Sequence, residues 1–254
     1  MVAAPAAADA IERARRLPNL RIGLHIVLVE SWPALSPSVI PDLVDTSGRL
    51  RADMARFGLD IALRPRVRRQ LAAEIAAQFE AFRATGLPLD HVNAHKHYHL
   101  HPVIAAQVIR IGHCYSMRAL RAPVEPAAVL ARVEPGSRSL EARVAAPWAA
   151  LLRLRARRAG LTVPDAVFGL AWSGAMTEPR LARLLAQCPD GLTEIYTHPA
   201  MAGGFEGQAS GYRYGDELAA LLSRACREAA AAAGARLGGY ADFLSSGSAP
   251  NASA

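Results

Sequence analysis

Histidine is concentrated in one short stretch of this chain. Five of its eight histidines lie between Asp90 and Pro102. Four of these occupy alternate positions: His95, His97, His99 and His101. Residues two apart on an extended strand point to the same side, so we expect a strand over residues 91–99 with imidazoles stacked on one face. Imidazole is the commonest metal-binding side chain and titrates near neutral pH. The pattern favours a metal or acid/base site over a structural polar strand, without specifying the reaction.

A second candidate ligand is His25. It lies within residues 20–29, an almost continuous apolar run that is rich in β-branched residues. Buried parallel strands have this composition. A single histidine in such a strand is often a structural residue, so the residue pattern alone leaves both interpretations of His25 open.

Two further polar residues mark the ends of predicted strands. Arg121 ends a short strand at residues 117–122, and His198 follows a strand at residues 192–197. Side chains that come from the ends of several strands are what a barrel-type α/β fold provides. These two residues are therefore candidates for the same kind of site as His25 and His95.

The elements that must position these residues alternate along the chain, which predicts a parallel α/β fold. The hydrophobic pattern places helices at residues 6–16, 66–85, 101–114, 125–160, 177–185 and 215–233. It places strands at residues 20–29, 91–99, 117–122, 192–197 and 236–240, with a small strand or loop at 168–174. The proline-containing segment 30–60 is predicted to be a long connection, of the kind that often forms a lid. The polar tail 245–254 is predicted to be disordered.

Composition limits the class of protein. The chain has 254 residues, 52% of them hydrophobic, which is enough for one large domain or two small ones. Its formal net charge is +7 and arises almost entirely from arginine, since Lys96 is the only lysine. No nucleic-acid-binding motif is present, so we expect no nucleic-acid partner. Three cysteines without a CxxC motif fit a reducing cytoplasm.

One basic, amphipathic segment allows two interpretations. Residues 147–160 combine Trp148 and several leucines with four arginines. Such a helix can lie at a membrane surface. The interpretation that we prefer is an ordinary helix that packs on the fold with a solvated basic face.

Taken together, four motifs resemble one known family. They are Gly23-Leu24-His25, Asn93 to His99, Arg121, and Glu194 to Pro199. Their order and spacing, over roughly residues 1–243, resemble those of the YdjC/ChbG-like carbohydrate deacetylases. Within that family, residues 24–30 and 93–102 look most like the hopanoid-biosynthesis branch, HpnK.

The resemblance implies a fold and a reaction. The fold is a distorted (β/α) barrel of the NodB/YdjC deacetylase type, in one domain over residues 1–244. The reaction is the hydrolysis of an N-acetyl group from an amino sugar with one divalent metal ion, Mg²⁺ or Zn²⁺. The substrate implied by the branch is an N-acetylglucosaminyl hopanoid lipid.

The resemblance also assigns roles to residues. His25 and His95 match the two histidine ligands of the metal, His198 matches the general acid, and Arg121 matches an arginine near the site. Four more residues are expected to contact the substrate or to orient the ligands: Asn93, His97, His99 and Glu194. The expected partners are the amino sugar, which could be lipid-linked, a membrane surface contacted peripherally at the inner membrane, and a second copy of the chain.

The sequence departs from the family pattern at its beginning. Family sequences start with a strand that ends in Asn-Ala-Asp-Asp-Phe-Gly, whose acidic pair supplies the third metal ligand, and this motif is not found here. We therefore expect the first strand and its carboxylates to be missing. Two alternatives to a deacetylase stay open: a catalytically inactive sugar-binding or scaffold protein, and a histidine-rich metal-binding protein without catalysis.

Overall fold

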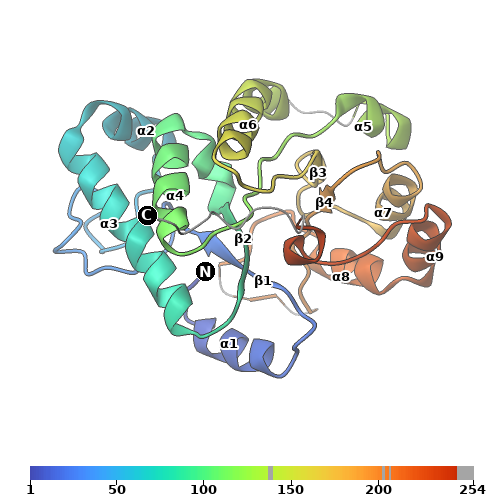
Figure 1. The fold of residues 1–254 in the computed structure, drawn as a ribbon, viewed down its shortest axis with the longest axis horizontal. Helices are drawn as coiled ribbons and strands as arrows, with labels where there is room; N and C mark the ends of the chain where they lie inside the picture. The colour runs from blue at the N-terminus through green and yellow to red at the C-terminus, as the bar shows by residue number, and fades with distance from the viewer. Residues whose placement is uncertain (137–139, 202–203, 206, 245–254) are drawn as a thin grey trace, which may run out of the picture. The chain divides into compact units, whose positions relative to one another are not determined.

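The computed structural model describes residues 1–136, 140–201, 204–205 and 207–244, and Figure 1 shows its helices and strands. The chain forms two compact units. The first contains Met1–Leu120, Ala156–Thr162 and the described residues from Gly238 onward, and the second contains Arg121–Arg155 and Val163–Leu237. Both units combine helices with a pair of parallel strands, so the α/β class predicted from the sequence is confirmed.

The first unit is built on strands β1 (Ile22–Ile26) and β2 (Leu89–Ala94), which pair in parallel. The register places His25 opposite Asn93. Parallel bridges join Val92 to Leu120 and Ala119 to Thr162. The strand residues Leu24, Ile26, Val92 and Ala94 are buried, because parallel strands of this kind are covered on both faces. The sheet therefore fixes where the side chains of His25 and Asn93 emerge.

Helices surround this sheet within the first unit. They are α1 (Ala7–Arg15), α2 (Met54–Leu63), α3 (Pro65–Ala84) and α4 (Pro102–Cys114), with the 3₁₀ helices η1 (His95–Leu100) and η2 (Tyr240–Phe243). Helix α3 begins with Pro65, which suits a first helical turn. Its buried apolar residues recur every three or four positions: Val67, Leu71, Ile75, Phe79 and Phe82. This is the stripe that a helix lays on a core.

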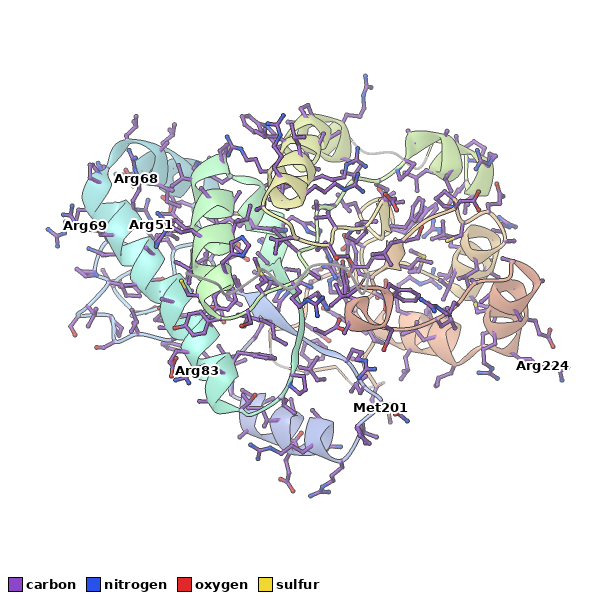
Figure 2. All side chains as sticks on the ribbon, viewed as in Figure 1. Arg51, Arg68, Arg69, Arg83, Met201 and Arg224 are labelled. Carbon is purple, nitrogen blue, oxygen red and sulfur yellow. The ribbon has the colours of Figure 1, made fainter. Side chains whose placement is uncertain are left out.

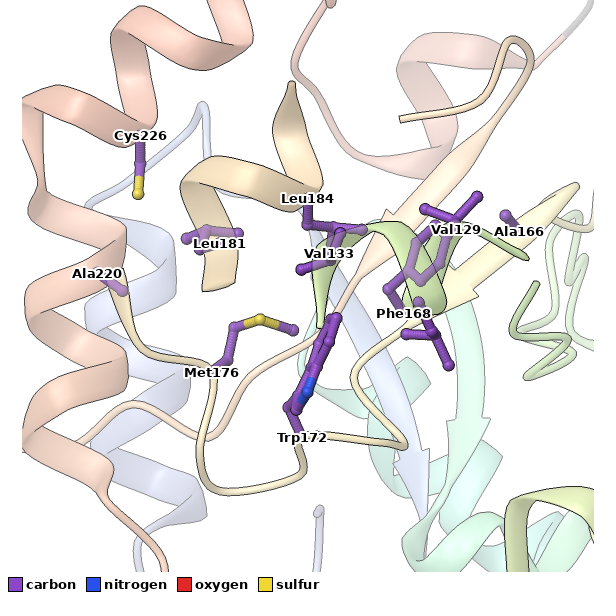
Figure 3. Packing of buried hydrophobic residues seen from close by; sticks show 11 residues of the cluster. Val129, Val133, Ala166, Phe168, Trp172, Met176, Leu181, Leu184, Ala220 and Cys226 are labelled. Carbon is purple, nitrogen blue, oxygen red and sulfur yellow. The ribbon is translucent and has the colours of Figure 1, made fainter. Parts of the chain in front are cut away.

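The second unit contains strands β3 (Ala166–Phe168) and β4 (Thr193–Ile195), again parallel. Its helices are α5 (Ala127–Val133), α6 (Leu140–Arg158, up to Arg155 in this unit), α7 (Glu178–Leu185), α8 (Tyr214–Leu222) and α9 (Arg224–Ala232). Figure 3 shows their core, in which Trp172 and Met176 lie beside α5 and α7. This packing holds the segment that follows β3.

Most predicted helices are confirmed, and some are divided. Helices α1, α3, α4 and α7 lie where the hydrophobic pattern placed them. The predicted helix over residues 125–160 is two helices, with Glu134, Pro135 and Gly136 outside both. The predicted helix over residues 215–233 is divided at Ser223, whose hydroxyl accepts a hydrogen bond from the backbone of Cys226 and so caps α9.

The histidine strand predicted over residues 91–99 is wrong beyond Ala94. The chain turns into η1, where Lys96 (φ 49°) and His97 (φ 51°) adopt left-handed conformations. This turn buries Tyr98, whose hydroxyl donates to the carbonyl of Met54 at 2.8 Å. The alternating histidines therefore do not lie on one strand face. His95, His97 and His99 instead lie in the partly buried 3₁₀ turn that leads into α4.

Four other strand or loop predictions change. Residues 117–122 form only bridges, at Ala119 and Leu120, and residues 236–240 lead into η2 instead of forming a strand. The small strand expected near Phe168 is β3, which begins at Ala166. The connection predicted over residues 30–60 ends earlier, because α2 begins at Met54. The tail 245–254 lies outside the described residues, and the single domain and the barrel stay predictions.

Many of the arginines lie at the surface. Figure 2 shows Arg69, Arg83 and Arg224 extending away from the ribbon. Arg83 and Arg224 pair with glutamates on their own helices, Glu80 and Glu228. Exposed pairs of this kind contribute little to stability. Among the described residues, no helix combines the length and the apolar character needed to cross a membrane.

Candidate functional site

The predicted metal ligands lie together in the first unit. His25 is on β1, and His95 directly follows β2. Their ring centroids are 5.7 Å apart, with the ring planes at 75°. Two imidazoles that each bind one metal at about 2.0–2.1 Å have centroids roughly 5 to 6 Å apart. The two rings are thus placed as a pair of ligands to one ion would be.

A hydrogen bond sets the orientation of His25. Its Nδ1 lies 2.6 Å from Oδ1 of Asn93, which is 8% exposed. Because an amide oxygen only accepts, Nδ1 of His25 donates and the lone pair of the ring is on Nε2. Metal-binding histidines usually donate their second ring N–H in this way. The two histidines therefore fit as part of a metal site, although the described residues contain no group of three His, Cys, Asp or Glu that could hold an ion.

The other predicted histidines of this stretch are arranged differently from the prediction. His99 is fully buried and His97 is half-buried, and their ring centroids are 6.2 Å apart. Both belong to η1 instead of continuing β2. Stacking of His95, His97 and His99 on one strand face was the wrong prediction, because the backbone leaves the extended conformation at Lys96.

An ion pair joins the segments that follow β1 and β2. Nζ of Lys96 donates to Oε1 of Glu30 at 2.6 Å. Glu30 (φ 59°) and Lys96 (φ 49°) are both left-handed, as is His97. Left-handed conformations of residues other than glycine concentrate at functional sites. This strain therefore lies in the segments that carry the histidine pair.

Arg121 and Glu194 form a buried pair in the second unit. Nε of Arg121 donates to both carboxylate oxygens of Glu194 at 2.9 Å, and Arg121 is 8% exposed. The guanidinium also lies 4.7 Å from the ring centroid of Tyr196. The family resemblance implied only that Arg121 lies near the site. In the structure its carboxylate partner is Glu194.

His198 lies in the same unit and is partly enclosed by aromatic rings. Its ring centroid is 5.8 Å from that of Tyr196 and 5.2 Å from that of Tyr212. Its backbone N–H donates to the fully buried Glu217. Its Nδ1 is buried and accepts or donates no hydrogen bond within the described part of the chain. Burial lowers the pKa of His198, Arg121 lowers it further and Glu217 opposes the shift, so neutral imidazole is favoured.

The sequence matches one protein family over most of its length. A family model described as YdjC-like protein matches residues 1–232. The chain belongs to the YdjC-like family.

Several relatives of this YdjC-like chain are named deacetylases. It is 33% identical over 106 residues to the carbohydrate deacetylase of Brevibacillus brevis, an alignment that covers 42% of this chain and 40% of the relative. It is 29% identical over 245 residues to the chitooligosaccharide deacetylase of Yersinia enterocolitica, covering 92% and 82%. For Brevibacillus brevis and several other curated relatives, the alignment spans less than half of the relative's length.

A solved structure shares the fold of this YdjC-like chain. It is a protein of Enterococcus faecalis V583 described as a cellobiose-phosphate cleavage protein. The superposition has a TM-score of 0.70 at 22% identity and covers 96% of this chain and 85% of the other. This likeness supports the fold alone.

From the sequence alone, His91 was assigned no role of its own. His91 is on β2, on the same side of the strand as Asn93, and only 17% of its side chain is exposed. Its ring lies over Gly23 of β1, where an added Cβ would be 2.6 Å from Cε1 of His91. Glycine inside a strand often marks such a close approach, so Gly23 was the available signal.

Glu74 and Gln78 of α3 are also buried, and they hold the segment that follows β1. Glu74 accepts hydrogen bonds from the backbone of Ala34 and Leu35 at 2.8 and 3.0 Å. The side chain of Gln78 pairs with both backbone groups of Val27. These contacts fix the long connection against α3.

Proposed function

We propose that this protein is a carbohydrate deacetylase, which hydrolyses the N-acetyl group of an amino sugar with the help of one divalent metal ion, Mg²⁺ or Zn²⁺. The observation that carries the proposal is the His25–His95 pair, in which Asn93 orients the ring of His25. The names of the deacetylase relatives support the reaction class.

His25 and His95 would hold the ion. When bound, the ion would supply a Lewis acid for the acetyl carbonyl. Asn93 keeps the lone pair of His25 on Nε2 by accepting the proton on Nδ1. His97 and His99, from η1, are proposed to support the site or to contact the substrate.

Two residues predicted from the sequence, His198 and Arg121, are proposed to supply the proton-transfer and polar groups. Amide hydrolysis needs a proton for the departing amine, and a positioned acid contributes roughly 10²–10⁴-fold. We assign this proton to His198, whose burial makes its imidazolium a stronger acid than that of an exposed histidine. Glu194 holds Arg121 in a fixed orientation, in which its guanidinium can orient the substrate.

Metal stoichiometry combined with acetate release tests this proposal. The chain is loaded with Zn²⁺ or Mg²⁺, the bound metal is counted, and acetate released from an N-acetylated chitooligosaccharide is measured. The proposal predicts one metal per chain and acetate release that stops with a chelator. Metal binding without acetate release would favour an inactive sugar-binding protein, and several ions per chain would favour a metal-binding protein without catalysis.

The finer substrate that we propose is an N-acetylglucosaminyl hopanoid lipid. The likeness of residues 24–30 and 93–102 to the hopanoid branch supports it. Acetate release from a lipid-linked N-acetylglucosamine, compared with release from a free chitooligosaccharide, tests this choice. Preference for the free sugar would contradict it.

A lipid-linked substrate suits a protein of the cytoplasm that contacts the inner membrane peripherally. Helix α6 exposes 63% of Val144, 47% of Trp148 and 46% of Leu154, and Arg155 and Arg158 are exposed near its end. Apolar residues flanked by arginines suit an anionic lipid surface. Co-sedimentation with vesicles that contain an anionic lipid, but not with neutral vesicles, is the expected result. The expected homodimer stays a prediction.

A further inference from the structure

A chain of hydrogen bonds runs from a buried carboxylate to the candidate metal ligand His25. It passes through Asp90, His91 and Asn93, all on β2, and then crosses to β1. Nδ1 of His91 is 2.8 Å from Oδ2 of Asp90, and Nε2 of His91 is 3.2 Å from Nδ2 of Asn93. Oδ1 of Asn93 is 2.6 Å from Nδ1 of His25.

Asp90, at the carboxylate end of these hydrogen bonds, determines which group donates in each of them. Asp90 is 4% exposed and accepts from the backbone N–H groups of Tyr240 and Ala241 at 3.1 and 2.8 Å. Burial alone would raise the pKa of Asp90, but the hydrogen bonds from His91 and from these amides hold it below its ordinary value. Asp90 is therefore an anion that can only accept.

The remaining donors follow in sequence. His91 donates through Nδ1, and in a neutral imidazole that donates there, Nε2 accepts. The group of Asn93 that meets Nε2 must then be the NH₂, which turns the amide oxygen toward His25. His25 therefore donates through Nδ1 and keeps its lone pair on Nε2, the nitrogen that is then free to bind a metal.

Two contacts hold the ring of His91 in place. The backbone of Gly23 approaches it closely, because no Cβ is there. The ring of Tyr240 stacks with that of His91, with centroids 4.5 Å apart and planes at 20°. This packing explains why glycine occupies position 23 of a buried strand.

We propose that His91 is a positioning residue: with Asp90 it orients the amide of Asn93 and thereby sets His25 in the Nδ1–H tautomer before any metal binds. The inference rests on the proposed role of His25 as a metal ligand, but it concerns a property of the metal-free chain. Second-shell partners of this kind typically change metal affinity by about 10- to 100-fold.

The tautomer of His25 can be observed directly. Long-range ¹H–¹⁵N NMR spectra of the metal-free protein with ¹⁵N-labelled histidine show which ring nitrogen carries the proton, and His25→Gln assigns the signals. The wild type is expected to show His25 protonated at Nδ1. In His91→Phe, which keeps a ring over Gly23, both tautomers are expected, with Zn²⁺ affinity reduced about 10- to 100-fold.

A second substitution separates orientation from packing. In His91→Phe/Asn93→Asp, the new carboxylate can only accept, so His25 must donate from Nδ1 again. The double variant should therefore restore the tautomer and most of the Zn²⁺ affinity. His113→Phe, at an exposed position near the end of α4, is the matched control and should change neither property.

Two results would overturn the proposal. One is a folded His91→Phe in which His25 stays protonated at Nδ1 and Zn²⁺ affinity changes less than about twofold, against the expected second-shell effect. The other is failure of the double variant to restore the tautomer. If His91→Phe does not fold, Gly23→Ala replaces it. This variant displaces the His91 ring but keeps Asp90, His91, Asn93 and His25. An unchanged His25 tautomer and Zn²⁺ affinity in this variant would also overturn the proposal.

Failure of the proposed function would look different. If the protein releases no acetate but its His25 tautomer changes in His91→Phe, the positioning role is supported and the deacetylase assignment is refuted. If the protein releases acetate but its His25 tautomer is unchanged in His91→Phe, the deacetylase assignment is supported and the positioning role is refuted.

Discussion

His198 illustrates how the surroundings of one residue modify a role assigned from sequence. A histidine before proline at the end of a strand was expected to act as a general acid. Burial lowers its pKa, so the imidazolium form is less populated near neutral pH than in an exposed histidine. The sequence indicated the residue, but it could not indicate the desolvation, which depends on Tyr196 and Tyr212 around the ring.

This shift predicts the titration of His198. Its ring should lose its proton at a pH below 6.5, the ordinary value, because burial disfavours the charged form. NMR titration of the metal-free protein measures the midpoint. A midpoint for His198 at or above 6.5 would contradict the account.

The pair of Arg121 and Glu194 predicts a stability effect. Their side chains are 10% and 13% exposed, so removing one charge leaves the other poorly solvated. Glu194→Gln should lower the free energy of unfolding by about 3 kcal/mol, as breaking buried pairs commonly does. Urea denaturation measures it, with the exposed Glu228→Gln as the control. A decrease in the free energy of unfolding no larger than that of Glu228→Gln would show that the pair of Arg121 and Glu194 is not effectively buried.

At the scale of elements, the apolar pattern was informative and the polar pattern was less so. Helix α3 was predicted because its apolar residues repeat with helical spacing and bury. The alternating histidines suggested a longer β2, but a polar alternation has no buried face to enforce an extended backbone. The chain instead turns at Lys96 to bury Tyr98. Of the candidate site, His25 and His95 were predicted from the sequence, whereas a role for His91 was indicated only by its contacts in the structure, including the one with Gly23.

Helix α3 also predicts a pH dependence of stability. Burial raises the pKa of Glu74, and the hydrogen bonds from Gln78 and the loop only partly oppose this. Between the ordinary value of 4.5 and its raised pKa, the folded state binds more protons than the unfolded state, so stability falls as pH rises. This contribution is fully present below 4.5 and is lost above the raised pKa.

The variant Glu74→Gln isolates this effect. It removes the titrating group, so the decrease in stability over this pH range should become smaller than in the wild type. Urea denaturation at several pH values between about 4 and 7 measures it. An unchanged pH dependence in the variant would show that Glu74 is not the group responsible.

At the scale of the whole molecule, the family assignment and the site support different conclusions. The match over residues 1–232 shows that the chain is YdjC-like, and the solved structure supports the fold. The activity is a property of the complete protein, and we propose it from the arrangement of His25, Asn93 and His95 together with the names of the relatives.

Acetate release from an N-acetylated chitooligosaccharide tests the central claim most directly. The wild type, His25→Gln, His95→Gln and the control His113→Gln are compared with Zn²⁺ or Mg²⁺ present. The account predicts acetate release by the wild type and the control, and a loss of at least about 100-fold in both ligand variants, as expected when a metal ligand is removed. Equal acetate release by all four proteins, or release by none of them with any N-acetylated sugar, would contradict it.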